Sequence, residues 1–320
     1  LPRGTVDVYL GGHTHSQMRH VVNGVPAAQS APFSREFSTV EIFIDRRARR
    51  VLDGRTIIRP PTMICAEVYR GTDHCDPRMA PAGAALEPRF FEGHRVARDA
   101  RVQAVIDPFL EHVADRRNQP LGLTATAPFT RTGLRESELG NLLADALREW
   151  SGADIAFMNS GGIRSNLRAG DLIYADIFEV SPFDNYPAIV TMTGAEVIES
   201  LRATSGGDRG LLQVSGLRYT IDASRDADKP PSQRNRVTAV TLANGEPVDR
   251  QKLYTVIMPD FLAYGGDGLA VVMNTIPPER IEIGQERPVR DVIIEALQRR
   301  NEPLTPLVEG RITIVNAPAR

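Results

Sequence analysis

The stretch Asp154-Ile155-Ala156-Phe157-Met158-Asn159-Ser160-Gly161-Gly162-Ile163-Arg164 decides the fold. Its first part, residues 154–158, is almost wholly apolar and predicts a buried strand. The strand runs into a glycine loop with an amide, Asn159, before it and a guanidinium, Arg164, after it. Such a loop can offer backbone N–H groups and a forked cation to an anion, while Asn159 can bond a ring or a hydroxyl. The alternative is a glycine turn that carries a surface arginine.

Helix and strand patterns alternate on both sides of this stretch. Ser137 can cap a helix that ends at Gly152, and Thr193-Gly194-Ala195-Glu196 is a capping box for another. Further strands are predicted over residues 189–192, 217–221, 237–242, 254–258 and 312–315. This mixture predicts an α/β (α+β) domain over residues 118–320.

Three more segments of this domain place binding chemistry beside turn residues. Arg131 and Arg135, four residues apart, would add two guanidinium groups that can each donate two hydrogen bonds to a phosphate. Taken alone, they are ordinary solvated charges. Phe183 and Phe261 each lie beside turn residues, and two such rings can hold a planar base between them, while Asp267 can accept from ribose hydroxyls. The alternative is that both phenylalanines belong to the core.

The start of the chain has a different character. A buried strand over residues 6–10 runs into Gly11-Gly12-His13-Thr14-His15, and Asn23-Gly24 predicts a tight hairpin. A further strand is predicted over residues 40–44. We expect residues 1–60 to be the closing strands of a β-rich sheet whose partners lie elsewhere. The His-x-His pair suits a metal site at a strand end, or else two solvated loop histidines.

Residues 61–117 predict a linker or insertion followed by a connecting helix, because 60–97 is rich in Pro, Gly and Arg and apolar residues recur at helical spacing from Val102. The two cysteines, Cys65 and Cys75, lie in this Pro-rich part. A short-loop disulfide is favoured over a zinc site, which needs more ligands, and it would indicate an oxidising compartment. The other possibility is two separate thiols in a reduced protein.

Composition excludes several classes of protein. Apolar residues make up 42% and charged residues 24% of the 320 residues, as in ordinary globular domains. The formal net charge is -2, so no global field favours a nucleic acid polymer. No apolar run approaches the roughly 18 to 20 residues of a membrane span.

In chain order, these motifs resemble those of the 5'-nucleotidase family of calcineurin-like metallophosphatases. The series runs through Gly-Gly-His-Thr-His, Asn-x-Gly-Gly-Ile-Arg, Pro-Phe-x-Asn, Met-Thr-Gly-x-Glu, Leu-Gln-Val-Ser-Gly, Phe-x-x-x-Gly-Gly-Asp-Gly and Glu-Gly-Arg-Ile. The resemblance implies a 5'-nucleotidase C-terminal-type domain, preceded by the last β-strands of a metallophosphatase β-sandwich domain.

The resemblance also implies residue roles. His13 and His15 would each bind one of two divalent metal ions, Zn, Mn or similar, whose other ligands and the catalytic His-Asp pair would lie upstream. The C-terminal domain would bind the nucleotide through base, ribose and phosphate contacts. By motif position these contacts belong to Arg131, Arg135, Asn159, Arg164, Phe183, Phe261 and Asp267, with weaker roles for Asn185 and Gly210.

The first hypothesis for function is therefore hydrolysis of nucleoside 5'-phosphates by a secreted, periplasmic or cell-surface protein, with this chain supplying substrate recognition and inactive alone. A second is a 2',3'-cyclic-nucleotide 2'-phosphodiesterase with 3'-nucleotidase activity, which shares the domain plan. A third, of another class, is a non-catalytic nucleoside-binding module. Base preference and oligomeric state are open, because stacking tolerates any base.

Overall fold

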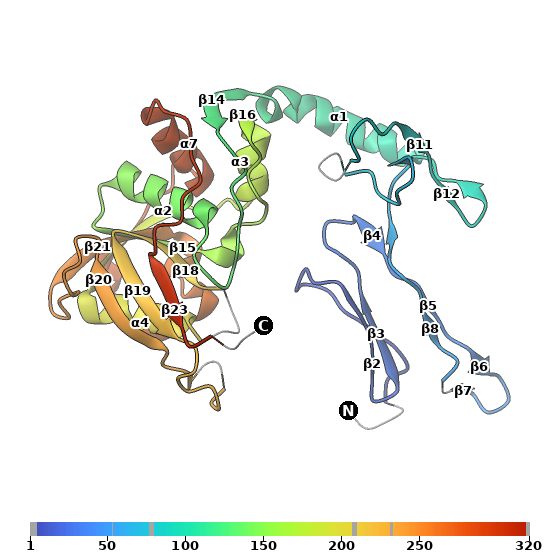
Figure 1. The fold of residues 1–320 in the computed structure, drawn as a ribbon, viewed down its shortest axis with the longest axis horizontal. Helices are drawn as coiled ribbons and strands as arrows, with labels where there is room; N and C mark the ends of the chain where they lie inside the picture. Colours follow the sequence, from blue (N-terminus) through green and yellow to red (C-terminus); the bar gives the residue numbers. More distant parts are fainter. Residues whose placement is uncertain (1–4, 53, 77–79, 207–209, 231–232, 318–320) are drawn as a thin grey trace. The chain divides into compact units, whose positions relative to one another are not determined.

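The structure is a computed structural model that describes residues 5–52, 54–76, 80–206, 210–230 and 233–317. The chain forms two compact units, residues 1–109 and 110–320 (Figure 1).

The first unit begins with a three-stranded sheet in the order β1 (Tyr9–Leu10), β3 (Val25–Gln29), β2 (Met18–Val22). β2 and β3 form the predicted hairpin, with Asn23 and Gly24 between them at φ 52° and 82°. Both values are positive, as the tightest two-residue hairpin turn requires, and this explains the Asn-Gly sequence. The hairpin prediction is confirmed.

The strand predicted over residues 6–10 is wrong in extent and in burial. β1 covers only its last two residues, and Tyr9 and Leu10 are both exposed. β1 pairs with β3 alone, at the edge of a three-stranded sheet, and Tyr9 and Leu10 are 57% and 72% exposed.

The rest of the first unit consists of short two-stranded ladders. The single strand predicted over residues 40–44 is wrong in extent, because β5 (Val40–Glu41) and β6 (Ile44–Asp45) pair with different strands. Residues 60–97 contain strands that their lack of periodicity did not indicate. The remaining ladder strands are β4 (Glu36–Phe37), β7 (Arg50–Val51), β8 (Ile57–Ile58), β9 (Thr62–Met63), β10 (Glu67–Tyr69), β11 (Leu86–Pro88), β12 (Phe90–Phe91) and β13 (His94–Arg95).

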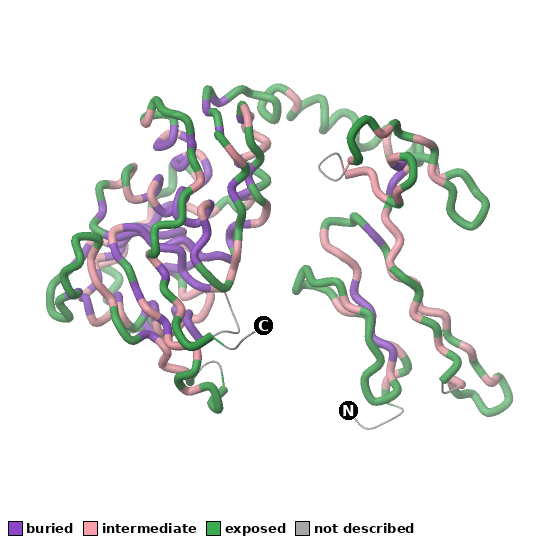
Figure 2. The backbone as a smooth tube through the Cα atoms, viewed as in Figure 1, coloured by how far each residue is buried: buried purple, intermediate pink, exposed green. Residues whose placement is uncertain are grey.

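A disulfide joins Cys65 to Cys75 in this part of the chain, with 6.0 Å between their Cα atoms. Cys65 is 3% exposed and Val68 is 7% exposed, so the bridge lies at one of the few buried points of the first unit. Figure 2 shows how little of this unit is buried. Two-residue ladders expose most of their side chains, so a covalent bridge compensates for a small core.

The helix predicted from Val102 is α1 (Ala100–Arg117), which contains the boundary between the two units. None of its residues is buried, although Val105 and Phe109 are apolar. Pro108 lies inside it. No helix in the described ranges of the chain is long and apolar enough to cross a membrane.

The second unit is built on a five-stranded sheet in the order β18 (Leu212–Ser215), β15 (Ile155–Asn159), β21 (Leu253–Pro259), β17 (Pro187–Thr193), β22 (Ile281–Ile283). β15 and β21 are parallel, and the other neighbours are antiparallel. The strands predicted near 155, 190 and 255 are confirmed within one or two residues. The α/β prediction for this domain is confirmed.

Side chains of β15 alternate between two cores, one on each face of the sheet. Ala156 and Met158 pack in the core with α2 (Glu138–Ser151) and α7 (Val289–Arg299). Ile155 and Phe157 pack in the core that contains α4 (Gly194–Thr204). Because both faces are covered, the first four residues of β15 are apolar, and the polar Asn159 comes only at the carboxyl end of this fully buried strand (Figure 2).

Other elements complete this unit. A second sheet, in the order β20 (Val237–Leu242), β19 (Leu217–Asp222), β23 (Ile312–Val315), was predicted strand by strand. The elements that were not predicted are β18 and β22 of the first sheet, β14 (Pro120–Ala125), β16 (Gly170–Ile173), α3 (Tyr174–Val180), α5 (Asp260–Ala263), α6 (Ala270–Met273) and α7.

Both predicted helix starts have the expected caps. The Ser137 side chain accepts from the Gly140 amide, and Gly152 ends α2 at φ 67°. Thr193 and Glu196 form a reciprocal capping box at the start of α4. These caps satisfy backbone donors that the helix itself leaves free, and they fix where each helix leaves the sheet.

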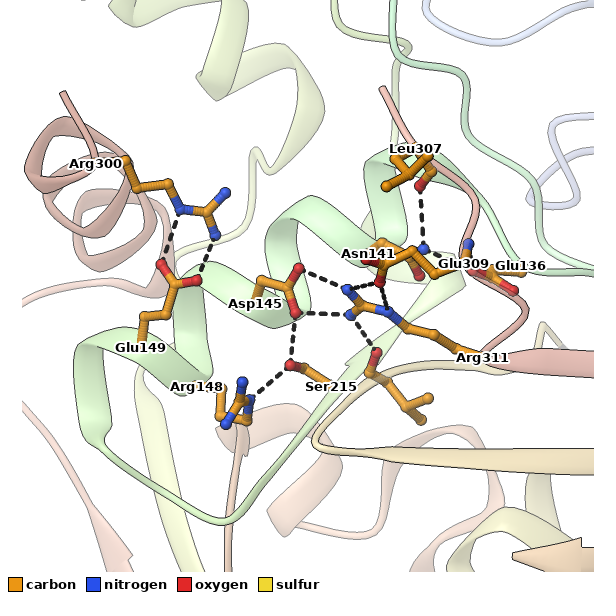
Figure 3. Close-up of polar contacts among 11 residues, drawn as sticks. Glu136, Asn141, Asp145, Arg148, Glu149, Ser215, Arg300, Leu307, Glu309 and Arg311 are labelled. Atoms are coloured by element: carbon orange, nitrogen blue, oxygen red, sulfur yellow. Dashed lines mark hydrogen bonds and ion pairs between the residues drawn. The ribbon is translucent and has the colours of Figure 1, made fainter. Parts of the chain in front are cut away.

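A polar network ties α2 to β18 and to the segment before β23 (Figure 3). Arg311 donates to both carboxylate oxygens of Asp145 at 2.7 Å and to the Val214 carbonyl at 2.9 Å. Ser215 donates to Asp145 at 2.6 Å and accepts from Arg148 at 2.7 Å. The last strand is therefore fixed by charged hydrogen bonds as well as by the sheet.

Candidate functional site

Asn159 ends β15 and begins the loop that the sequence singled out. Its side chain is 5% exposed, and its Nδ2 donates to Oδ2 of Asp267 at 3.0 Å. Its Oδ1 is buried and has no hydrogen-bond partner in the described part of the chain. A buried amide oxygen without a hydrogen bond lowers the stability of a fold, so Oδ1 is a candidate acceptor for a ligand.

Asp267 follows α5 in a glycine-rich turn. Its φ and ψ are 52° and 26°, in the left-handed region, and Gly265 and Gly268 beside it are at φ 88° and 92°. A Cβ on Gly161 would lie 3.6 Å from Oδ2 of Asp267, so the two loops approach closely where Gly161 has no side chain. The loops that follow the parallel strands β15 and β21 thus meet at one sheet edge.

Arg164 joins this loop to Phe183. Its Nη1 donates to the Gly161 carbonyl at 3.0 Å, and its Cζ lies 5.7 Å from the centroid of the Phe183 ring. Phe183 is 44% exposed, so its ring is not a core residue. A guanidinium over an aromatic face is attracted by the ring, and its planar fork matches the geometry of a phosphate.

Arg131 contributes a second guanidinium close to the first. It donates to the Ile163 carbonyl at 2.8 Å. Burial, and then the like charge of Arg164, lower the pKa of the Arg131 guanidinium, although an arginine stays charged at any ordinary pH. Among the described residues no carboxylate forms an ion pair with Arg131. Two neighbouring cations create a local positive field that suits an anion.

Phe261 brings a second exposed ring to the same loops. It is 41% exposed, and a Cβ on Gly266 would lie 2.4 Å from its Cε1, so the ring lies against the backbone next to Asp267. In the described ranges no ring contact joins Phe261 to Phe183. Both phenylalanines are thus partly exposed, at 44% and 41%, and neither ring covers the other.

Gln213 is a residue whose importance the sequence reasoning missed. It is fully buried in β18, its Oε1 accepts from the Ser137 amide at 3.0 Å, and its Nε2 donates to the Arg135 carbonyl at 3.0 Å and to Ser160 Oγ at 3.2 Å. A Cβ on Gly210 would lie 2.9 Å from the Ser160 side chain. The backbone of Arg135 and Gly210 is thus held beside the glycine loop. The signal was a lone glutamine inside a strand of buried residues.

Asn185 lies further along the Phe183 loop, and the loop is attached to α7. The Asn185 carbonyl accepts from the Val289 amide at 2.7 Å. The adjacent Arg290, 5% exposed, donates to the Ser181 carbonyl at 3.1 Å and to Asp184 at 2.9 Å. The sequence reasoning missed Arg290 because α7 was not predicted.

His13 and His15 lie in the first unit, directly after β1. Both are exposed, at φ 71° and 57°, and the His15 ring meets the Phe33 ring edge-on at 4.9 Å. No group of three or more His, Cys, Asp or Glu side chains among the described residues could hold a metal ion. Two imidazoles fit only part of a two-metal centre, which takes several more ligands.

Comparison with known proteins gives these loops a family context. Residues 119–274 match the family model for the 5'-nucleotidase C-terminal domain. A "5'-nucleotidase-related protein" of Glossina morsitans morsitans is 26% identical over 97% of this chain and 57% of its own length. A 5'-nucleotidase of Vibrio parahaemolyticus is 36% identical over 42% of this chain and 22% of its own length.

A solved structure agrees at the level of the fold. A 5'-nucleotidase precursor from Thermus thermophilus superposes with a TM-score of 0.69, over 97% of this chain and 58% of that chain, at 22% identity. This chain therefore spans little more than half the length of that structure and of the Glossina relative.

Proposed function

Because residues 119–274 match the family model for the 5'-nucleotidase C-terminal domain, we propose that this chain recognises nucleoside 5'-phosphates for hydrolysis by a metal-dependent phosphoesterase. The observation that carries the proposal is the meeting of two loops at one sheet edge. Asn159 is bonded to Asp267 there, with arginines and exposed rings beside them. Neither Phe183 nor Phe261 belongs to the buried cores of the unit.

Each part of a nucleotide has a partner in this arrangement. The base would enter between Phe183 and Phe261, whose residues are 44% and 41% exposed. The ribose hydroxyls would donate to Oδ1 of Asp267, because Oδ2 already accepts from Asn159. The phosphate would be bound by three guanidiniums, those of Arg131, Arg135 and Arg164. Asn185 and Gly210 would make weaker contacts.

Hydrolysis requires more than this chain's own residues supply. Two divalent metal ions, when bound, would polarise the phosphoryl group and activate water. His13 and His15 would each donate one imidazole to them, and the arginines would neutralise charge on the phosphate. We propose that the chain alone binds a nucleotide without cleaving it.

The disulfide supports a proposal on location. Bridges such as Cys65–Cys75 persist in oxidising surroundings and are rare in reducing ones. We propose that the protein acts outside the cytoplasm, as a secreted, periplasmic or surface enzyme.

Phosphate release assays test this function. The chain alone, given AMP with Mn²⁺ or Zn²⁺, should release no phosphate above a blank that contains only metal. A protein that joins this chain to a metal-binding domain of the family should hydrolyse AMP faster than 3'-AMP or 2',3'-cyclic AMP. The reverse preference would establish the cyclic phosphodiesterase alternative, and no hydrolysis of any of them would favour a non-catalytic binding module.

A further inference from the structure

We infer that Arg290, on α7, is a positioning residue that holds the Phe183 loop in the shape that receives a base. This inference rests on the proposed nucleotide site. It concerns a residue 107 positions away in sequence, outside every motif that indicated the site. Arg290 does not itself meet the nucleotide.

The contacts of Arg290 enclose the loop from one side. Its Nη1 donates to the carbonyls of Ser181 at 3.1 Å and Phe183 at 3.4 Å, and its Nη2 donates to Asp184 at 2.9 Å. Three points on one short loop are thus tied to one planar group. A fork of fixed geometry limits how far the loop can rotate.

The guanidinium is itself held in place by α3. Its Nε donates to the Tyr174 hydroxyl at 2.9 Å, and its Cζ lies 4.7 Å from the centroid of the Phe178 ring. The Arg290 side chain is 6% exposed, whereas that of Asp184 is 81% exposed. The carbonyl bonds and the stacking therefore fix the loop, and the screened ion pair adds little.

Arg290 holds the backbone from which the exposed Phe183 ring projects. A ring with 44% exposure has few packing neighbours to define its direction. Its carbonyl bond to a buried arginine fixes the backbone from which it projects. If the ring is already in place, less conformational entropy is lost when a base stacks on it, so the nucleotide binds more tightly.

Arg290→Lys tests the inference, because lysine keeps the charge and loses the fork. Dissociation constants of the chain for AMP and for ribose 5-phosphate, which has no base, are measured by calorimetric titration. AMP should bind about tenfold more weakly to the variant, the loss expected for a misplaced stacking ring. Ribose 5-phosphate should bind within about twofold of wild type. Arg300→Lys, at the end of the same helix and bidentate to Glu149, is the matched control and should change neither value.

A double-mutant cycle separates positioning from general stability. If Arg290 acts through Phe183, then Arg290→Lys should cost nothing further in a Phe183→Ala background. Three results would overturn the inference: independent losses of AMP affinity from the two substitutions, equal losses of affinity for AMP and ribose 5-phosphate, or wild-type AMP affinity in Arg290→Lys. The proposed function would remain intact in each case, provided that Phe183→Ala alone weakens AMP binding. If the wild-type chain fails to bind AMP, the proposed function itself fails.

A milder variant serves if Arg290→Lys does not fold. Tyr174→Phe removes only the hydroxyl, which accepts from Arg290 Nε at 2.9 Å and donates to Asp291 at 3.3 Å; only the first of these bonds holds Arg290. AMP affinity should fall about threefold, in keeping with one hydrogen bond, and ribose 5-phosphate affinity should not change. Unchanged AMP affinity in a folded Tyr174→Phe variant would count against the inference.

Discussion

At the residue scale, the site depends on a few side chains whose positions are fixed by backbone geometry. Asp267 adopts a left-handed conformation between two glycines, and Asn159 donates to one of its oxygens. We propose that the second carboxylate oxygen accepts from a ligand. An aspartate in this conformation is strained, and such strain persists where the surroundings hold it for function.

Asp267→Asn should reduce recognition of the ribose hydroxyls. Loss of the charged acceptor is expected to weaken AMP binding about tenfold, as hydrogen bonds to charged groups are worth more than neutral ones. Binding of 2',3'-dideoxy-AMP should barely change. Asp260→Asn, seven residues earlier, is the control. Equal losses for both ligands would show that Asp267 does not read the hydroxyls.

At the element scale, the second unit depends on polar links between α2 and the last strand. Glu136, 6% exposed, accepts from Asn141 at 2.7 Å and from the amides of Glu309 at 2.8 Å and Ile312 at 3.1 Å. Burial acts to raise the pKa of this carboxyl, but these bonds outweigh it and lower the pKa below the usual 4.5. The carboxylate is thus the form that the fold stabilises.

Glu136→Gln should destabilise the chain in a pH-dependent way. A lowered pKa contributes stability that is present above pH 4.5 and is lost as pH falls through the folded value. Urea unfolding at pH 7 should show a free energy of unfolding about 2 kcal/mol lower than that of wild type. This difference in free energy should shrink below pH 4.5. The exposed Glu302→Gln serves as control. A pH-independent difference would contradict this account.

Arg311→Met should lower the free energy of unfolding by about 3 kcal/mol, because it leaves the carboxylate of Asp145 partly buried with only Ser215 as a donor among the bonds in Figure 3. Arg300→Met breaks a pair whose acid, Glu149, is 45% exposed, and should cost less than about 1 kcal/mol. Chemical denaturation of both variants measures the contrast. Equal losses would mean that the network in Figure 3 does not stabilise the fold.

At the scale of the whole molecule, the chain combines a thinly packed β-rich unit with a unit that has two cores. The first unit buries few apolar side chains, among them Ala27, Ala28 and Val68, whereas the sheet of the second is covered on both faces. Stability is therefore unevenly distributed, and local opening should be easiest in the first unit.

Replacing Cys65 and Cys75 by Ser should affect the first unit alone. Removing a bridge that closes a short loop is expected to cost about 2 kcal/mol locally. Hydrogen exchange followed by mass spectrometry should show faster exchange in residues 62–76 and unchanged protection in β15 and β21. Loss of protection in those central strands would show that the units unfold together.

Strands and caps with strong local signals could be predicted from the sequence. β15, the Ser137 cap and the Asn23-Gly24 hairpin each follow from residues within one element. The loop contacts of Asn159 with Asp267 could be proposed only through the order of motifs, because 108 residues separate the two side chains.

Other features had no local signal. α7 follows Pro288 without a side-chain cap, so its start was not predicted and Arg290 was missed with it. The ladders of residues 60–97 are two or three residues long, too short for alternation to show. Gln213 was visible only as part of the Leu-Gln-Val-Ser-Gly motif, because the strand that holds it was not predicted and its partners lie on two other loops.

Calorimetric titration of the chain with AMP tests the central claim most directly, in wild type and in a variant with Phe183→Ala and Phe261→Ala. The account predicts binding by wild type, its loss in the double variant, and unchanged binding in Phe90→Ala, which removes an exposed ring of the first unit. Binding that survives the double variant, or no binding by folded wild type, would contradict a nucleotide site between these two rings.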